Sequence, residues 1–218
     1  SSYRFIGRGG EGFEHVNLTG QVSVDARVSL AYKLGADGQV SLAYGKFRQS
    51  AKNEFIKVDP FLDAEKATHY IFNYQYVKDK KTLRIETYYK SYSDLIKYTD
   101  GDPLKLTNQG TGNAKGVELF WRDNETISRL DYWISYSYLD TERNYLDFPN
   151  DATPTVASKH NVSIVAKYFV QKIKSQLGAT YSFTSGRPYN DPNIHSINKL
   201  RTPNYADLTF NWSYLPTA

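Results

Sequence analysis

Apolar and polar side chains alternate with a period of two along most of this sequence, and this pattern constrains the fold more than any other feature. In segment 171–186, every second residue from Ile173 is Ile, Ser, Leu, Ala, Tyr and Phe, whereas the residues between are Lys, Gln, Gly, Thr and Ser. A helical arrangement of the same segment gives no apolar stripe. Successive side chains of a strand point to opposite faces of a sheet, so the pattern predicts a β-strand.

The same alternation recurs along the chain and predicts an all-β protein of about nine strands. The first segment keeps its alternation back to Val16, which makes it longer than a membrane-crossing strand needs to be. The segments are 28–34, 40–44, 70–76, 83–89, 117–121, 130–138, 162–170, 173–183 and 208–214.

Short and long connections alternate between these segments. The short ones lie at 35–38, 78–81, 123–128 and around Gln171, as expected of hairpin turns. The long ones, rich in Asp, Asn, Pro, Gly and Thr, span 48–66, 97–113, 140–158 and 185–203. In an antiparallel up-and-down sheet, this order places all tight turns at one end and all long loops at the other.

The apolar row is rich in aromatic residues, because the chain contains 19 Tyr and 3 Trp in 218 residues. A phenol in a dry core needs a hydrogen-bond partner, whereas at a membrane interface its polar end stays wet, and membrane barrels carry aromatic girdles there. The opposite row mixes small, neutral and charged groups of both signs, which a wet lumen accepts. We therefore expect a transmembrane barrel with its apolar row against lipid.

Two other architectures fit an alternating pattern. A soluble all-β binding module would bury the Tyr-rich row between two sheets. A self-contained small outer-membrane barrel, acting as an adhesin or pore, would close on its own strands. An odd count of nine means either that one strand is missed or that the chain is an excerpt from a larger wall, because bacterial barrels have even strand counts.

Composition excludes several other classes. The chain has no Cys, which leaves neither a disulfide framework nor a cysteine zinc site. No apolar run of ~18 residues is present to form a membrane helix. The net charge is only +4 and the basic residues are dispersed, so nucleic acid is not an expected partner.

An ordered series of short motifs resembles the C-terminal half of the barrel in TonB-dependent outer-membrane receptors, particularly those of Bacteroidetes type. The resemblance covers about 24–215. Its motifs are Tyr44, Gly45, Phe47 and Gln49; Leu62, Glu65, Tyr70 and Tyr74; Asp94, Leu95 and Ile96; Gly116 and Glu118; and Gly186, Arg187, Pro188 and Tyr189.

This resemblance implies that residues 1–218 form one barrel segment from a wall of about 22 strands, with the plug domain and the final strands absent from this chain. It implies an outer-membrane receptor for energy-coupled uptake of a bulky nutrient, such as a ferric siderophore, a cobalamin-like molecule or an oligosaccharide. The implied partners are outer-membrane lipid, the TonB complex acting through the plug, the small-molecule or oligosaccharide ligand, and a surface lipoprotein.

The sequence shows no catalytic constellation, so we expect no enzyme activity, cofactor or metal. The four His residues are far apart in sequence, and a G-x-S-x-G frame is absent. Ligand contacts are expected from the long loops, where aromatic and cationic residues gather. The candidate substrate-binding residues are Arg143, Tyr145, Arg187, Tyr189, His195 and Arg201.

Overall fold

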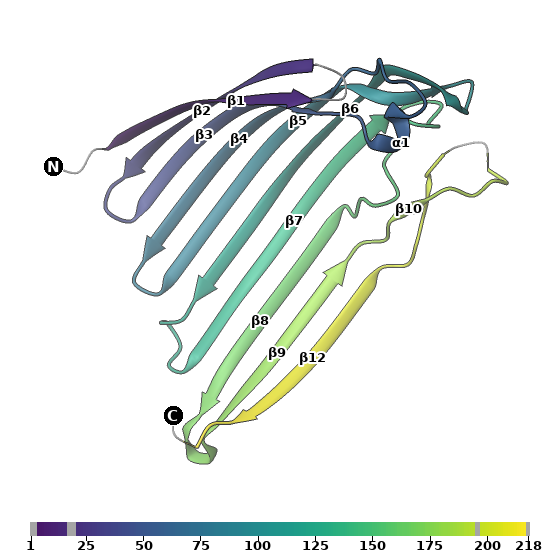
Figure 1. The fold of residues 1–218 in the computed structure, drawn as a ribbon. Coiled ribbons are helices and arrows are strands. Elements are labelled where there is room, and N and C mark those ends of the chain that lie inside the picture. Colours follow the sequence, from purple (N-terminus) through teal and green to yellow (C-terminus); the bar gives the residue numbers. More distant parts are fainter. Residues whose placement is uncertain (1–3, 17–20, 195–196, 217–218) are drawn as a thin grey trace.

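The computed structural model describes residues 4–16, 21–194 and 197–216. Ten strands form one antiparallel sheet in which neighbours along the sheet follow one another in the chain, apart from β12, which pairs with β9 after a small hairpin of β10 and β11 (Figure 1). The strands are β1 Phe5–Val16, β2 Gln21–Leu34, β3 Gly38–Gln49, β4 Glu65–Lys78, β5 Lys81–Thr99, β6 Asp102–Asp123, β7 Leu130–Asn144, β8 His160–Val170, β9 Ser175–Thr184, β10 Pro188–Tyr189, β11 Leu200–Arg201 and β12 Tyr205–Tyr214.

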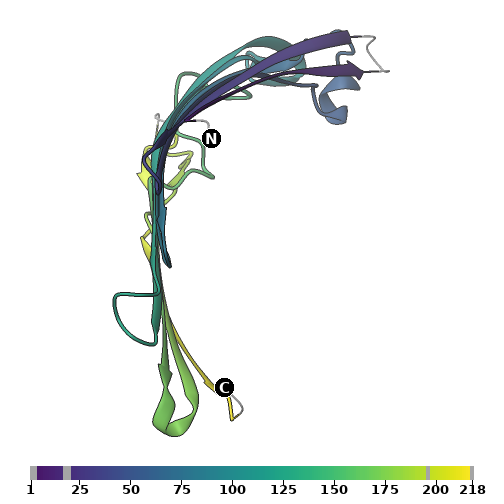
Figure 2. The ribbon, with the colours of Figure 1, turned by 90° about the vertical axis from the view of Figure 1, so that its left-hand side faces the viewer.

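The sheet bends into an open arc, with β1 and β12 at its two edges (Figure 2). The turns β2–β3, β4–β5, β6–β7 and β8–β9 lie together at one end of the strands (Figure 1). The long connections, which include helix α1 (Asn53–Ile56), lie at the other end together with the tight β5–β6 turn (Figure 1). This confirms the expected antiparallel up-and-down architecture. None of the helices in the described ranges is long and apolar enough to cross a membrane.

One face of the sheet carries the apolar row, and this row is uncovered. Leu42 is 57% exposed, Phe210 73% and Trp212 68%. No second sheet packs on this face within the described part of the chain, since the remaining small sheet consists only of β10 and β11. The arrangement fits the wall of a lipid-facing barrel and does not support a soluble sandwich, which would bury these rings.

The opposite face carries the polar row, and its side chains bond across strands. The Asn73 amide donates a hydrogen bond to Glu86 at 3.4 Å. Nearer the short turns, the Arg122 guanidinium donates two hydrogen bonds to the Asp131 carboxylate, at 2.9 and 2.7 Å. In a barrel whose apolar row faces lipid, this polar row lines the interior.

The boundaries of the first and the eighth predicted strands differ from the sequence-based expectation. Val16 ends β1 and does not continue into β2, so the alternation from Val16 to Leu34 crosses two strands and the sheet gains a tenth member. Ile173 lies in the short 3-10 helix Gln171–Ile173, and β9 begins only at Ser175 after Lys174 adopts a left-handed conformation (φ 43°).

The expectation of a long loop over 97–113 is wrong. Strand β5 continues to Thr99 and β6 starts at Asp102, joined by Asp100 and Gly101, which both have positive φ (55° and 71°). Beyond the lipid both faces of a strand meet water, so the sequence need not alternate there. The hairpin therefore lacks the pattern by which strands were recognised.

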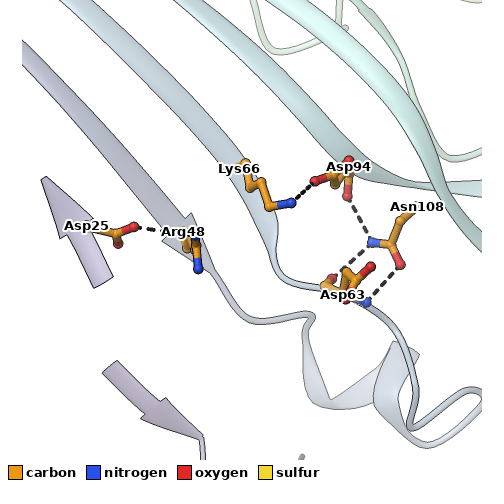
Figure 3. Close-up of polar contacts among 6 residues, drawn as sticks. All are labelled: Asp25, Arg48, Asp63, Lys66, Asp94 and Asn108. Atoms are coloured by element: carbon orange, nitrogen blue, oxygen red, sulfur yellow. Dashed lines mark hydrogen bonds and ion pairs between the residues drawn. The ribbon is translucent and has the colours of Figure 1, made fainter. Parts of the chain in front are cut away.

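The long-loop end has its own packing. Ala51, Leu62 and Ile96 form a small buried cluster against α1. Asn108 joins two segments, because its amide nitrogen donates to the carbonyls of Asp63 and Asp94, both at 2.9 Å, and its oxygen accepts from the Asp63 N–H at 2.9 Å (Figure 3). These contacts anchor the 50–64 connection to the β5–β6 hairpin.

Candidate functional site

A hollow of about 290 Å³ lies on the polar face where β5, β6 and β7 meet the connection after β7. We call it the inner hollow. Strand residues form its floor and residues 154–157 cover one side. It is lined by Tyr88, Lys90, Tyr92, Ala114, Leu139, Thr141, Arg143, Tyr145, Pro154, Val156 and Ala157.

Strand geometry brings the functional groups of the inner hollow together. Tyr88, Lys90 and Tyr92 are spaced two apart on β5 and therefore share a face. The Lys90 ammonium lies over the Tyr88 ring, 4.6 Å from its centroid, and the Arg143 guanidinium lies 4.5 Å from that of Tyr92 and 5.6 Å from that of Tyr145. These are cation–π distances, so the rings hold both cations at the hollow.

Two glycines of β6 make room for these side chains. A Cβ at Gly116 would lie 2.4 Å from the Tyr88 hydroxyl oxygen and 2.5 Å from the Tyr138 carbonyl. A Cβ at Gly112 would lie 2.8 Å from Arg143 Cγ. Glycine is required at both positions because the larger side chains fold across the strand between them.

We predict that Gly116→Ala in the full-length protein destabilises the sheet by about 1–2 kcal/mol, because the added methyl overpacks against Tyr88 and the β7 backbone. Gly10→Ala is the matched control, since a Cβ there meets no atom within 4 Å. Equilibrium unfolding in detergent measures both. Adding Tyr88→Ala should recover part of the loss, and equal stability of the two single variants would contradict this packing.

The connection after β7 is held in place by backbone pairing. Arg143 and Ala152 exchange two hydrogen bonds, at 2.9 and 3.0 Å. Leu146 pairs with the end of β5, donating its N–H to the Ile96 carbonyl at 2.7 Å. The Lys97 ammonium donates to the Asn144 side-chain oxygen and to the Phe148 carbonyl. These contacts fix the position of Tyr145 beside Arg143.

The second long connection, 185–204, is hydrogen-bonded to the connection after β7. The Arg187 side chain donates to the Ser158 hydroxyl at 3.3 Å, and the Asn198 amide donates to the Thr153 carbonyl at 3.0 Å. Within its own loop, Arg201 donates to the Gly186 carbonyl at 3.3 Å. Pro188 is fully buried. The two long connections therefore form one joined unit at this end of the wall.

The structure brings together some of the candidate residues predicted from sequence and separates others. Arg143 and Tyr145 both line the inner hollow. Arg187 and Arg201 make the loop hydrogen bonds described above, and Tyr189 lies in β10 with 41% of its surface exposed. None of these three residues lines the inner hollow. His195 lies outside the described residues.

Sequence reasoning did not select three residues of the inner hollow, namely Tyr88, Lys90 and Tyr92. A signal for them was present. Tyr88 and Tyr92 are large aromatic residues on the polar row of β5, opposite the row that carries Leu83 and Ile85. Aromatic side chains that face a wet interior cannot anchor the barrel in lipid, and they therefore indicate a surface that contacts a ligand. In the described residues no group of His, Asp and Glu is placed to bind a metal.

A strongly curved antiparallel wall, with an uncovered apolar face, a polar inner face and long connections gathered at one end, defines a segment of an outer-membrane β-barrel. The family model for the TonB dependent receptor-like β-barrel matches residues 9–216. The chain belongs to that family. A comparison with curated proteins found no match.

Solved structures share the fold at low sequence identity. FrpB, an iron transporter from Neisseria meningitidis, has a TM-score of 0.75 at 10% identity over 99% of this chain and 37% of its own. The ferric citrate transporter FecA has a TM-score of 0.74 at 12% identity, over 98% of this chain and 36% of its own. The ferric-catecholate import receptor Fiu from E. coli K12 has a TM-score of 0.71 at 12% identity, over 90% of this chain and 29% of its own. This chain thus spans about a third of the length of these receptors.

Family membership confirms several expectations drawn from the sequence. The chain is part of an outer-membrane receptor barrel and is not an enzyme. The family supports neither a small independent barrel nor a soluble module. Membership of the Bacteroidetes branch stays a prediction, as do the domain limits and the six candidate ligand residues.

Proposed function

We propose that the protein is a receptor for energy-coupled uptake of a bulky nutrient, and that this chain supplies part of its wall and its ligand-contacting loops. The observation that carries the proposal is the inner hollow, which is lined by Lys90, Arg143 and three Tyr side chains. It lies next to the connection after β7, which is hydrogen-bonded to the 185–204 connection. Aromatic and Arg side chains are enriched at recognition surfaces. A pocket on the lumen side at the long-loop end is suited to receive a ligand that arrives from outside.

The energy for uptake is proposed to come from the TonB complex, acting through a plug domain that is not part of residues 1–218. The family assignment supports this coupling. Outer-membrane lipid is the partner of the uncovered apolar row, and a surface lipoprotein is proposed as a further partner on the basis of the Bacteroidetes-type motifs alone.

The proposed cargo is a ferric siderophore, a cobalamin-like molecule or an oligosaccharide. Structures of the same fold include receptors named for ferric citrate, ferric catecholate and copper. Cationic groups at the inner hollow suit the anionic ferric chelates among these candidates.

Uptake tests the proposal directly. We expect that the full-length receptor, expressed in cells without their own ferric-chelate receptors, accumulates radiolabelled cargo from a panel of ferric chelates, cobalamin and oligosaccharides only while TonB is present. A Lys90→Gln, Arg143→Gln double variant should reduce accumulation at least tenfold, because both cations of the hollow are lost. Accumulation that is independent of TonB, or none with any panel member, would contradict the proposed function.

A further inference from the structure

The inner hollow is part of a wider basic surface on the polar face of β1–β7. Strand register defines it, because residues directly opposite one another across a sheet share a face. One rung of such partners crosses all seven strands and contains three basic residues, Arg27, His69 and Lys90. It runs Gly10, Arg27, Gly45, His69, Lys90, Ala114 and Thr141.

The rungs on either side extend the surface. Towards the short turns, the next rung begins at Arg8 and reaches Tyr88, through Ser29, Ala43 and Ile71. Towards the long connections, another runs from Phe47 to Tyr92 and Arg143, through Ala67 and Gly112. None of these positions carries Asp or Glu. On β1 and β2 the next pair of the polar face after Gly10 and Arg27 is Gly12 and Asp25, so a single carboxylate lies at that corner of the surface.

The sign of charge changes one rung further towards the short turns. There Glu86 and Glu118 face each other directly across β5 and β6. Asp25, the carboxylate beside the basic surface, is paired with Arg48 at 3.5 Å (Figure 3). A rung with two carboxylates therefore borders the basic surface on its short-turn side, and the next basic residues of the polar face, Lys33 and Arg84, lie one rung beyond it.

The cations of this basic surface are not neutralised by ion pairs. Arg8, Arg27, Lys90 and Arg143 form none with any described residue. Three of these cations lie over aromatic rings. Arg27 is 4.6 Å from the centroid of Phe47, Lys90 lies over Tyr88, and Arg143 lies over Tyr92. The Arg143 Nε atom is buried without a hydrogen-bond partner in the described part of the chain.

A second hollow, of about 350 Å³, lies at the other end of the basic surface. Arg8, Arg27, Phe47 and His69 contribute to it. Arg27 on β2 is three strands from Lys90 on β5 and five strands from Arg143 on β7. At the usual spacing of neighbouring strands this corresponds to about 14 Å and about 24 Å along the sheet. The two hollows thus offer separate cationic contacts on one continuous wall.

We infer that the basic surface between Arg27 and Arg143 is a two-point receptor for a ligand that carries at least two anionic groups and planar rings. The inference rests on the proposed function and narrows its cargo. Unpaired cations attract anionic groups, the aromatic faces beside them accept planar rings, and a spacing of about 14 Å to Lys90 and about 24 Å to Arg143 selects a bulky ligand. A neutral oligosaccharide finds no Asn, Gln, Asp or Glu among the three rungs to bind its hydroxyls.

Binding of matched probes to the purified full-length receptor tests this inference. The probes are a ferric tris-catecholate of charge −3 and a neutral ferric trihydroxamate of similar size. We expect at least a hundredfold lower Kd for the anionic chelate. Arg27→Gln and Arg143→Gln should each raise that Kd at least tenfold and leave the Kd of the neutral chelate unchanged. Lys172→Gln, at the short-turn end, removes the same charge and should change neither value.

Three results would overturn the inference: equal affinity for the two chelates, an unchanged Kd in both arginine variants, or no binding of the anionic chelate. If the arginines were purely structural, their substitution would lower stability without altering the preference between the two probes. That result would also contradict the inference. The proposed function fails separately. TonB-dependent uptake of a neutral cargo with no effect of these arginines would refute only the two-point site, whereas anion binding without TonB-dependent uptake would refute only the transport.

Discussion

Leu42→Arg in the full-length receptor is expected to destabilise the barrel by about 2–4 kcal/mol, the cost of Arg near the bilayer midplane. Leu42 is the fifth of twelve residues in β3 and projects from the apolar row. Its partners across the sheet, Leu30 and Phe72, are also apolar and exposed. In lipid an arginine there must bury its charge or deform the bilayer.

Ser41→Arg is the matched control for this prediction. Ser41 precedes Leu42 on the same strand, lies on the polar face and has Ala31 and Asn73 as its cross-strand partners. We expect a change within about 1 kcal/mol there, because lumen positions tolerate polar substitutions. Equilibrium unfolding of the two variants in lipid vesicles gives the comparison. Equal tolerance at both positions would mean that the apolar row does not face lipid.

Sequence periodicity was sufficient to predict the membrane-facing part of the fold. Along β4 the row Tyr70, Phe72, Tyr74 and Tyr76 alternates with His69, Ile71, Asn73 and Gln75, because lipid on one side and water on the other select different side chains at successive positions. The same contrast indicated the short turns, since alternation stops where the chain leaves the bilayer and reverses.

Periodicity failed where that contrast is missing. Strand β1 contains "GRGGEG", whose glycines and charges give no apolar row, so its pairing with β2 was not predicted. The distal part of the β5–β6 hairpin has register shifts after Tyr92 and Leu95, which disturb a period-two pattern. Strand β1 and the distal parts of β5 and β6 are defined by backbone pairing with a neighbour and not by their own composition.

The candidate site was predictable only in part for a related reason. Arg143 and Tyr145 were recognised because the segment 140–158 mixes aromatic and cationic residues, although Arg143 belongs to β7 and not to a loop. Tyr88 and Lys90 come from a strand about 55 residues earlier, and only the register through Gly116 and Ala114 of β6 places them beside Arg143. Contact across three strands depends on pairing that a single sequence does not specify.

The Gly-Arg-Pro-Tyr segment at 186–189 owes its conformation to close backbone contact. A Cβ at Gly186 would lie 1.8 Å from the Thr202 carbonyl oxygen, and the Gly186 N–H donates to the Asn204 side chain at 2.9 Å. Thr202 in turn donates its N–H to the Arg187 carbonyl at 2.9 Å. Because the obstructing atom belongs to the backbone, no rotamer change relieves the clash.

Gly186→Ala is therefore expected to unpair β10 from β11 and release the 185–204 connection, at a local cost of about 3 kcal/mol. That cost shifts the opening equilibrium on the order of a hundredfold. Limited trypsin digestion of the folded receptor measures it, since cleavage after Lys199 and Arg201 should accelerate in proportion while the barrel keeps its heat-modifiable migration. Asn190→Ala, at an exposed position of the same loop, should leave cleavage unchanged. If Gly186→Ala is cut no faster than this control, the contact between Gly186 and Thr202 does not hold the loop, and the latch through Arg187 and Ser158 must do so alone.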